Sequence, residues 1–227
     1  MGKKLFPASF LLLLSLFFHP VPVSAHQPNY TGNKTEVTIT EPEISRAFYG
    51  TLHGTPITFT VTSSKPFQFY GGLLVPDTLN ARTDFTLDIF DKENSLLSTL
   101  TGSQWPRYYE EFARDWYLKG PEYKTTLSAG TYTLILSNPE NKGVYVLAVG
   151  ETESFPINTL LSLFPELIQI KTNIFGKPWY DAFINIFGFA LGGIVVFIVL
   201  FILGVSLLIQ KKKKNKKRMP SELKRTK

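Results

Sequence analysis

The stretch "LSAGTYTLILSNPENKGVYVLAVGE" (residues 127–151) consists of two apolar runs separated by a turn. Three large side chains of the first run share one face, which predicts a strand with one buried side: Tyr132, Leu134 and Leu136. In the turn, Gly143 can adopt a positive φ. The second run, residues 144–149, is apolar on both faces, so we expect a central strand that is covered from two sides.

The same period-two alternation recurs upstream of this hairpin. In "ITFTVT" (residues 57–62) Ile57, Phe59 and Val61 alternate with threonines, which is typical of a half-buried strand. Further strands are expected at residues 44–52, 66–75 with a bulge at Gly71 and Gly72, 85–89, 96–100 and 123–127. About eight short strands at close spacing predict an all-β fold, a single β-sandwich or jelly roll over residues 43–151.

Residues 103–120, "SQWPRYYEEFARDWYLKG", interrupt the strand pattern. Four rings recur there at helical spacing: Trp105, Tyr109, Phe112 and Trp116. Glu110 precedes Arg114 by four positions, a favourable order for a helical ion pair. We expect a short helical insertion whose rings are buried over one end of the sandwich, so that truncation of Trp116 would destabilise the domain.

The alternative for the same segment is an exposed binding surface for a glycan or protein ligand. Large rings stack on sugars and peptides, and neighbouring carboxylates supply polar contacts. The candidate ligand-binding residues are Trp105, Tyr108, Tyr109, Glu110, Glu111, Asp115 and Trp116. The sequence leaves both interpretations open.

The first 42 residues divide into two parts. Residues 1–25 carry two lysines, then an apolar run, then small residues that end at Ala25, which is typical of a secretory signal peptide cut before His26. An uncleaved anchor is the alternative, although the apolar run is short for a span. Residues 26–42 are polar, and we expect an exposed leader in which Asn29 and Asn33 begin N-glycosylation motifs.

Residues 182–210 contain no charged side chain and predict a transmembrane helix, because about 20 apolar residues cross the roughly 30 Å of hydrocarbon. The basic residues of the tail, 211–227, favour the cytoplasmic side, so we expect a type I protein of the cell membrane with its ectodomain outside. The span holds Gly188 and Gly192, whose GxxxG spacing is typical of a weak homodimer contact.

The charge of the chain is unevenly distributed, and the segment before the predicted span is amphipathic. Of the total charge of +6, the signal contributes two positive charges and the tail nine, which leaves residues 26–210 at −5, so the basic pI does not indicate a nucleic-acid partner. The juxtamembrane segment, residues 152–181, is amphipathic and either lies on the bilayer or packs on the sandwich. Its apolar face contains Leu160, Leu161, Phe164, Leu167 and Ile168.

The last hairpin also carries a family resemblance. Ala129-Gly130-Thr131-Tyr132 followed by Gly143-x-Tyr145-x-Leu147, together with "FTLDIFDKENSLLSTL" (residues 85–100), resembles the bacterial pre-peptidase C-terminal domain over residues 46–150. The resemblance implies a small, non-catalytic β-sandwich that serves secreted enzymes as a binding or folding module. The chain departs from that family at Gly54-Thr55-Pro56, where members have an acidic, aromatic strand entry that contributes to calcium binding.

Motifs for catalysis or cofactor binding are missing from the sequence. The chain has no cysteine, no GxSxG, no Walker motif and no HExxH. Asp84, Asp88 and Asp91 are better explained as a solvated strand face than as calcium ligands, and a copper site of His26 with His53 has little support. We therefore expect no metal and no cofactor.

Composition and order together favour a non-enzymatic, single-pass protein that displays a binding or scaffold module. Two alternatives stay open. One is a cargo adaptor similar to the p24 family. Such proteins have a cysteine pair and a coiled coil before the span, and this sequence shows neither. The other is a glycan-acting enzyme that uses the carboxylates of Glu110, Glu111 and Asp115.

Overall fold

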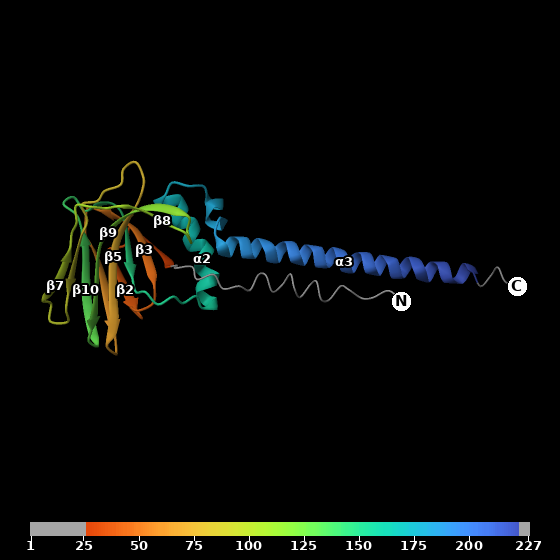
Figure 1. Cartoon of the computed structure of the whole chain (residues 1–227), viewed down its shortest axis with the longest axis horizontal. Helices are drawn as coiled ribbons and strands as arrows, with labels where there is room; N and C mark the ends of the chain where they lie inside the picture. The colour runs from red at the N-terminus through yellow and green to blue at the C-terminus, as the bar shows by residue number, and fades with distance from the viewer. Residues whose placement is uncertain (1–25, 223–227) are drawn as a thin grey trace.

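The computed structural model describes residues 26–222, without the side chains of residues 157–158, 160–161 and 215–222, and it contains a two-layer β-sandwich (Figure 1). One sheet has six strands in the order β1-β3-β11-β5-β9-β8, and the other has five in the order β2-β4-β10-β6-β7. The strands are β1 (Gln27–Gly32), β2 (Glu36–Thr40), β3 (Arg46–His53), β4 (Ile57–Ser63), β5 (Phe67–Pro76), β6 (Thr86–Phe90), β7 (Leu96–Leu100), β8 (Arg107–Glu110), β9 (Asp115–Leu127), β10 (Gly130–Ser137) and β11 (Lys142–Val149). The predicted all-β sandwich is confirmed.

The polar leader expected at residues 26–42 is wrong, because these residues form β1 and β2. β1 pairs in parallel with β3, and β2 pairs in parallel with β4, so the two strands extend one edge of each sheet. Ile39 of β2 is buried in the core between the sheets. The polar composition misled because alternate residues of an edge strand face water. Asn33 lies exposed in the turn between the two strands, while Asn29 is half-buried within β1.

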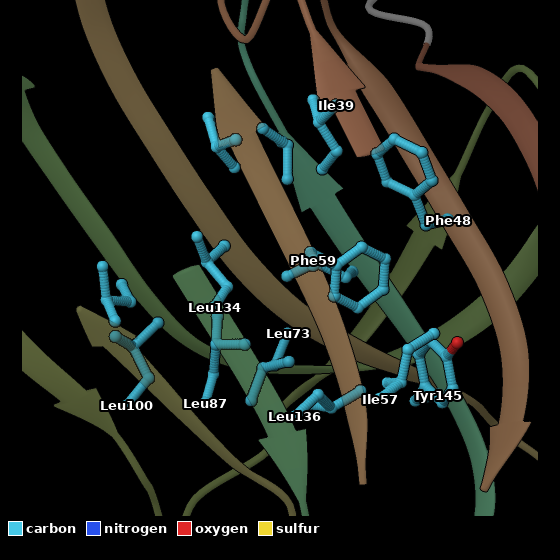
Figure 2. Close-up of a cluster of buried hydrophobic side chains, with 14 of the residues drawn as sticks. Ile39, Phe48, Ile57, Phe59, Leu73, Leu87, Leu100, Leu134, Leu136 and Tyr145 are labelled. Atoms are coloured by element: carbon cyan, nitrogen blue, oxygen red, sulfur yellow. The ribbon is translucent and has the colours of Figure 1, made fainter. Parts of the chain in front are cut away.

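The core lies between the two sheets and includes the alternating residues that the sequence predicted in β4 and β10 (Figure 2). Phe59 is fully buried and makes edge-to-face contacts with Phe48 and Tyr145, at ring-centroid distances of 5.6 and 6.3 Å. Leu134 and Leu136 of β10 complete the same layer. The bulge predicted at Gly71 and Gly72 is seen as a register shift between Gly72 and Leu74 where β5 pairs with β9.

The predicted helical insertion at residues 103–120 is wrong. β8 and β9 form an antiparallel hairpin there, with a four-residue turn at residues 111–114 in which Arg114 has a φ of 57°. One edge of β5 is paired with β9 over almost its whole length. A helix at residues 103–120 would have left backbone groups of β5 on that edge without hydrogen-bond partners. Trp105 precedes the hairpin and packs against Gly120, where a Cβ atom would lie 2.5 Å from the ring.

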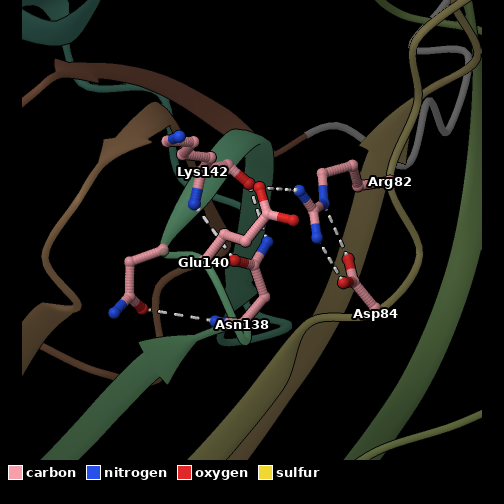
Figure 3. Close-up of polar contacts among 6 residues, drawn as sticks. Arg82, Asp84, Asn138, Glu140 and Lys142 are labelled. Carbon is pink, nitrogen blue, oxygen red and sulfur yellow. Dashed lines mark hydrogen bonds and ion pairs between the residues drawn. The ribbon is translucent and has the colours of Figure 1, made fainter.

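The turn before β11 is held by side chains that bond to the backbone (Figure 3). Asn138 accepts a hydrogen bond from the amide of Lys142 and donates one to its carbonyl, at 3.0 and 2.7 Å. Arg82 donates to both carboxylate oxygens of Asp84 and also to Glu140. Gly143 has a φ of 109° and lies against Arg82, which confirms the positive φ that the sequence predicted.

The segment predicted to lie next to the membrane, residues 152–181, folds onto the six-stranded sheet. This part of the chain forms α2 (Ile157–Gln169), the π-helix η1 (Ile170–Ile174) and the 3-10 helix η2 (Trp179–Phe183). Ile170 and Ile174 pack on the outer face of that sheet against Tyr49, Tyr117 and Val146. The structure thus places this segment on the sandwich. It also explains why β11 is apolar on both faces: one face contacts the core, and the other contacts η1.

The chain continues into α3 (Ile186–Glu222). Within the described residues, Ile186–Lys214 is the stretch long and apolar enough to cross a membrane, with a mean hydropathy of 3.0 and none of its most apolar window buried. Ala182, expected in the span, is instead buried against the sandwich. α2 lies across the end of the sandwich from which α3 leaves (Figure 1). The predicted signal peptide, residues 1–25, and the end of the predicted tail, residues 223–227, lie outside the described residues.

We expect Phe59→Ala to lower the free energy of unfolding by about 3 to 5 kcal/mol, because a fully buried ring leaves a cavity between the sheets. Denaturant unfolding of the detergent-solubilised chain, followed by circular dichroism, measures the change. Thr60→Ala is the matched control, since Thr60 is the next residue of β4 and faces outward. An equal loss in both variants would contradict the assigned core.

Candidate functional site

The seven candidate ligand-binding residues lie in or beside the β8–β9 hairpin, but the structure does not bring them together on one surface. Tyr109 and Trp116 are cross-strand partners on the face that points away from η1. Tyr108, Glu110 and Asp115 are on the opposite face, beside Tyr117. Two further candidates lie elsewhere: Glu111 is exposed in the turn, and Trp105 packs against the core.

The exposed face of the hairpin carries an aromatic cluster, which consists of Arg107, Tyr109 and Trp116. The rings of Tyr109 and Trp116 are 5.0 Å apart at an angle of 51°, and they are 36% and 46% exposed. The Arg107 guanidinium lies 4.6 Å from the centre of the Trp116 ring and pairs with Asp77. The expectation that Trp116 is buried is therefore wrong, whereas Phe112, in the turn, is buried as expected. Removal of Trp116 leaves no internal cavity, so its cost to stability is small.

The opposite face holds a buried ionic cluster of Asp115, Lys171 and Lys177. The Asp115 side chain is fully buried, and its two oxygens accept hydrogen bonds from Lys171 Nζ and Lys177 Nζ, each at 2.6 Å. Lys171 Nζ also donates to the Ala113 carbonyl at 2.6 Å. The hairpin is thereby tied to η1 and to the loop that follows it.

The sequence interpretation missed both lysines of this cluster. They lie 56 and 62 positions from Asp115, so no local motif joins them. A signal was nevertheless present, because Lys171 and Lys177 are the only basic residues between Glu151 and the span. A lysine within an apolar, amphipathic segment requires either a buried acidic partner or water.

Glu110 lies beside the ionic cluster without a complete set of partners. One of its carboxylate oxygens accepts a hydrogen bond from the Ala113 amide at 2.5 Å, and the other, Oε1, is buried with no hydrogen-bond partner among the described residues. Burial raises the pKa of Glu110 to about 7; the nearby Asp115 adds to this rise, while the Phe112 and Ala113 amides and Lys171 oppose it. The carboxyl group faces a small cavity that His26, Tyr49 and Lys171 also line.

The tip of the hairpin packs on the helices that lead to α3. Phe112 contacts Phe155 and Phe187, at ring-centroid distances of 6.0 and 5.4 Å, and lies in one cluster with Leu163, Leu167 and Ala182. Asn185 accepts a hydrogen bond from the Gly188 amide at the start of α3 and donates one to the Ala182 carbonyl. α3 is consequently joined to the sandwich by packed side chains.

The residues considered as metal ligands have other roles. Asp84 pairs with Arg82 (Figure 3), Asp88 accepts a hydrogen bond from Thr99, and Asp91 accepts two from backbone amides of its own turn. His26 and His53 lie at opposite ends of β3, roughly 23 Å apart by strand rise. Among residues 26–222 no group of three His, Cys, Asp or Glu side chains is arranged to hold a metal ion.

No protein-family model and no curated protein matches the chain. Among solved structures, it is similar to the pre-peptidase C-terminal domain of a collagenase from Bacillus anthracis, with 12% identity and a TM-score of 0.30 over 58% of this chain and 98% of that domain.

Two β-glucosidases, from Paenibacillus barengoltzii and Kluyveromyces marxianus, are similar at 11% identity and a TM-score of 0.25, over 57% and 50% of this chain. The chain spans only 14% and 12% of the length of these two enzymes. Similarity at this level carries no argument about the activity of this chain.

We expect Lys171→Met to lower the free energy of unfolding by about 3 to 5 kcal/mol, because it leaves a buried carboxylate with one cation in place of two. Lys177→Met is the matched control and should cost about 1 kcal/mol or less, since its side chain is 38% exposed and water can take its place. Adding Asp115→Leu to Lys171→Met should recover most of the loss in denaturant unfolding. No recovery in the double variant would contradict the explanation that the loss comes from the carboxylate left behind at Asp115.

The contribution of Glu110 to the free energy of unfolding should fall as the pH rises from about 4.5 to about 7, and then level off. This contribution is the difference between the wild-type and Glu110→Gln profiles, because the lowered pKa of the neighbouring His26 acts in the opposite direction in both proteins. In this interval the unfolded chain ionises Glu110 while the folded chain keeps it protonated, so folding loses up to about 3 kcal/mol at roughly 1.4 kcal/mol per pKa unit. Glu110→Gln should flatten this part of the profile and be the more stable protein at pH 8. The exposed neighbour provides the control, because Glu111→Gln should keep the wild-type profile. An unchanged profile for Glu110→Gln would contradict the assignment.

Proposed function

We propose that the protein is a non-enzymatic, single-pass membrane protein that displays its β-sandwich outside the cytoplasm as a binding or scaffold module. The observation that carries the proposal is the packed connection between sandwich and span. Phe112 of the hairpin and Phe187 of α3 are in direct ring contact. The sandwich is therefore held in a defined orientation at the N-terminal end of α3, where the proposed span begins.

The orientation across the membrane follows from charge. Lys211–Lys214 and the basic residues after them continue directly from the apolar part of α3, and basic residues on this side favour the cytoplasm. The sandwich then lies outside, in agreement with the predicted signal peptide. The exposed aromatic cluster is the proposed contact surface of the module, because solvent-accessible tryptophan, tyrosine and arginine are enriched where proteins bind partners.

The geometry gives less support to the alternatives. A glycan-acting enzyme needs two carboxylates that flank one bond, yet Glu111 is exposed in the turn, and Glu110 and Asp115 are buried beneath α2 and η1. A p24-like adaptor would need a coiled coil before its span. Here α2 has 13 residues and packs on the sandwich. The homodimer contact is not part of the proposal, because the position of a Cβ on Gly188 lies 1.9 Å from the Phe183 carbonyl oxygen, although Gly192 is open.

The absence of cysteine from the chain permits a direct test of this topology. We expect a membrane-impermeant maleimide to label Thr62→Cys, an exposed position of β4, in intact cells. Asn215→Cys, in the tail, should react only after the membrane is permeabilised, and the cysteine-free parent is the control for background labelling. Labelling of Asn215→Cys in intact cells would overturn the proposed orientation.

A further inference from the structure

We infer that the exposed aromatic cluster of the β8–β9 hairpin contacts the phospholipid headgroup layer of the leaflet that α3 enters. The inference rests on the proposed function, in that α3 is taken as the membrane span, and it names the partner of the same contact surface. It also assigns Tyr109 and Trp116 a role as interfacial anchors that lie about 70 residues before the span in the sequence.

Ring contacts fix the depth of the hairpin tip. Phe187 is the second residue of α3, and the stretch that can cross a membrane begins at Ile186. This stretch is longer than the roughly 20 residues that hydrocarbon requires, so a tilted span places Phe187 at the boundary between hydrocarbon and headgroups. Phe112, in the turn of the hairpin, contacts that ring at a centroid distance of 5.4 Å. The turn therefore lies at or just above this boundary, whatever the sequence separation. Figure 1 shows β8 at the end of the sandwich from which α3 leaves.

The aromatic cluster lies a short distance above the turn. Glu110 and Asp115 flank the turn, and Tyr109 and Trp116 form the next cross-strand pair. At about 3.3 Å per strand residue, their backbone is within about 10 Å of the boundary. The headgroup region on each side of the hydrocarbon core is about 5 to 8 Å thick, so the two large rings can reach into it.

The chemistry of the surface fits this environment. Tryptophan and tyrosine are enriched at membrane interfaces because an apolar ring and a polar group meet there. η2 supplies a second such pair, Trp179 and Tyr180, both more than half exposed and seven and six residues before Ile186. Arg114 is exposed in the hairpin turn and has no carboxylate partner among the described residues, so it is available to a lipid phosphate.

A sugar-stacking platform fits the same rings less well. Such a platform needs a free ring face, but the guanidinium of Arg107 covers one face of Trp116, and Tyr109 packs against the ring at 5.0 Å. These two contacts reduce the ring surface that could stack on a pyranose ring, whereas partly exposed tryptophan and tyrosine rings suit the headgroup layer.

The test uses the three tryptophans of the chain. Trp116 and Trp179 are expected in the headgroup layer, and Trp105 is not. The full-length protein is reconstituted in phosphatidylcholine vesicles with and without lipids brominated near the top of the acyl chains. Three double Trp→Phe variants each retain one tryptophan. The retained residue is Trp116 in the test variant, Trp179 in the positive control, and Trp105 in the negative control, since Trp105 packs at Gly120, about 17 Å along β9 from Asp115.

We expect brominated lipid to quench Trp116 at least half as strongly as Trp179, and to leave Trp105 within experimental error of the unbrominated sample. If Trp116 behaves like Trp105 while Trp179 is quenched, the headgroup contact is overturned and the membrane anchor stands. If neither Trp116 nor Trp179 is quenched, the proposed membrane anchoring itself fails. If soluble glycan, and not brominated lipid, changes Trp116 emission, the surface is a glycan site and the inference is wrong.

A single substitution that retains the other two tryptophans provides a second test in case the double variants misfold. Trp116→Ala should keep the wild-type circular dichroism spectrum and lose about half of the total quenching by brominated lipid. Tyr132→Phe, a buried change in β10 of the opposite sheet, should lose none and serves as its control. Quenching that is unchanged in Trp116→Ala would overturn the inference.

Discussion

The structure depends on the need to cover both faces of β11. Residues 145–149 of this strand are buried, and one face contacts the opposite sheet. The other face, with Val146, would be exposed if the chain left the sandwich directly for α3. Ile170 and Ile174 cover it instead, which forces the juxtamembrane residues to fold back across the sheet. The start of α3 is consequently placed against the sandwich and not at the end of a free tether.

This return of the chain creates the conditions for the buried ionic cluster. Because α2 and η1 lie on the sheet beside the β8–β9 hairpin, Lys171 and Asp115 are both removed from water. Burial of a charge pair adds little net stability, but it penalises any arrangement in which one partner is displaced. The pair therefore specifies how the hairpin sits on the juxtamembrane helices. Glu110 lies at the same contact between hairpin and helices, and the burial of its unpartnered oxygen lowers the stability of the fold.

The hairpin shows why a correct periodicity can lead to the wrong element. Tyr109 and Trp116 are seven residues apart, which places them on one face of a helix. A hairpin with a four-residue turn pairs the same two residues directly across its strands. Local spacing cannot separate these cases, because both bring the rings together. The distinction came from β5, which is far away in sequence and whose edge pairs with β9. In the resulting hairpin the ring of Trp116 is exposed, whereas a helix would have buried it.

The amino-acid sequence determined the features that arise from local alternation and from long apolar runs. The strands of the core, the bulge in β5, the positive φ of Gly143 and the apolar helix that can span a membrane were all predicted, because each depends on neighbours within a few positions. Tertiary structure decided that the residues after His26 are edge strands, that the aromatic segment is a hairpin, and that Asp115 meets Lys171. These outcomes depend on which backbone edges and charges are left without partners once the core has formed, and that information is distributed over the whole chain.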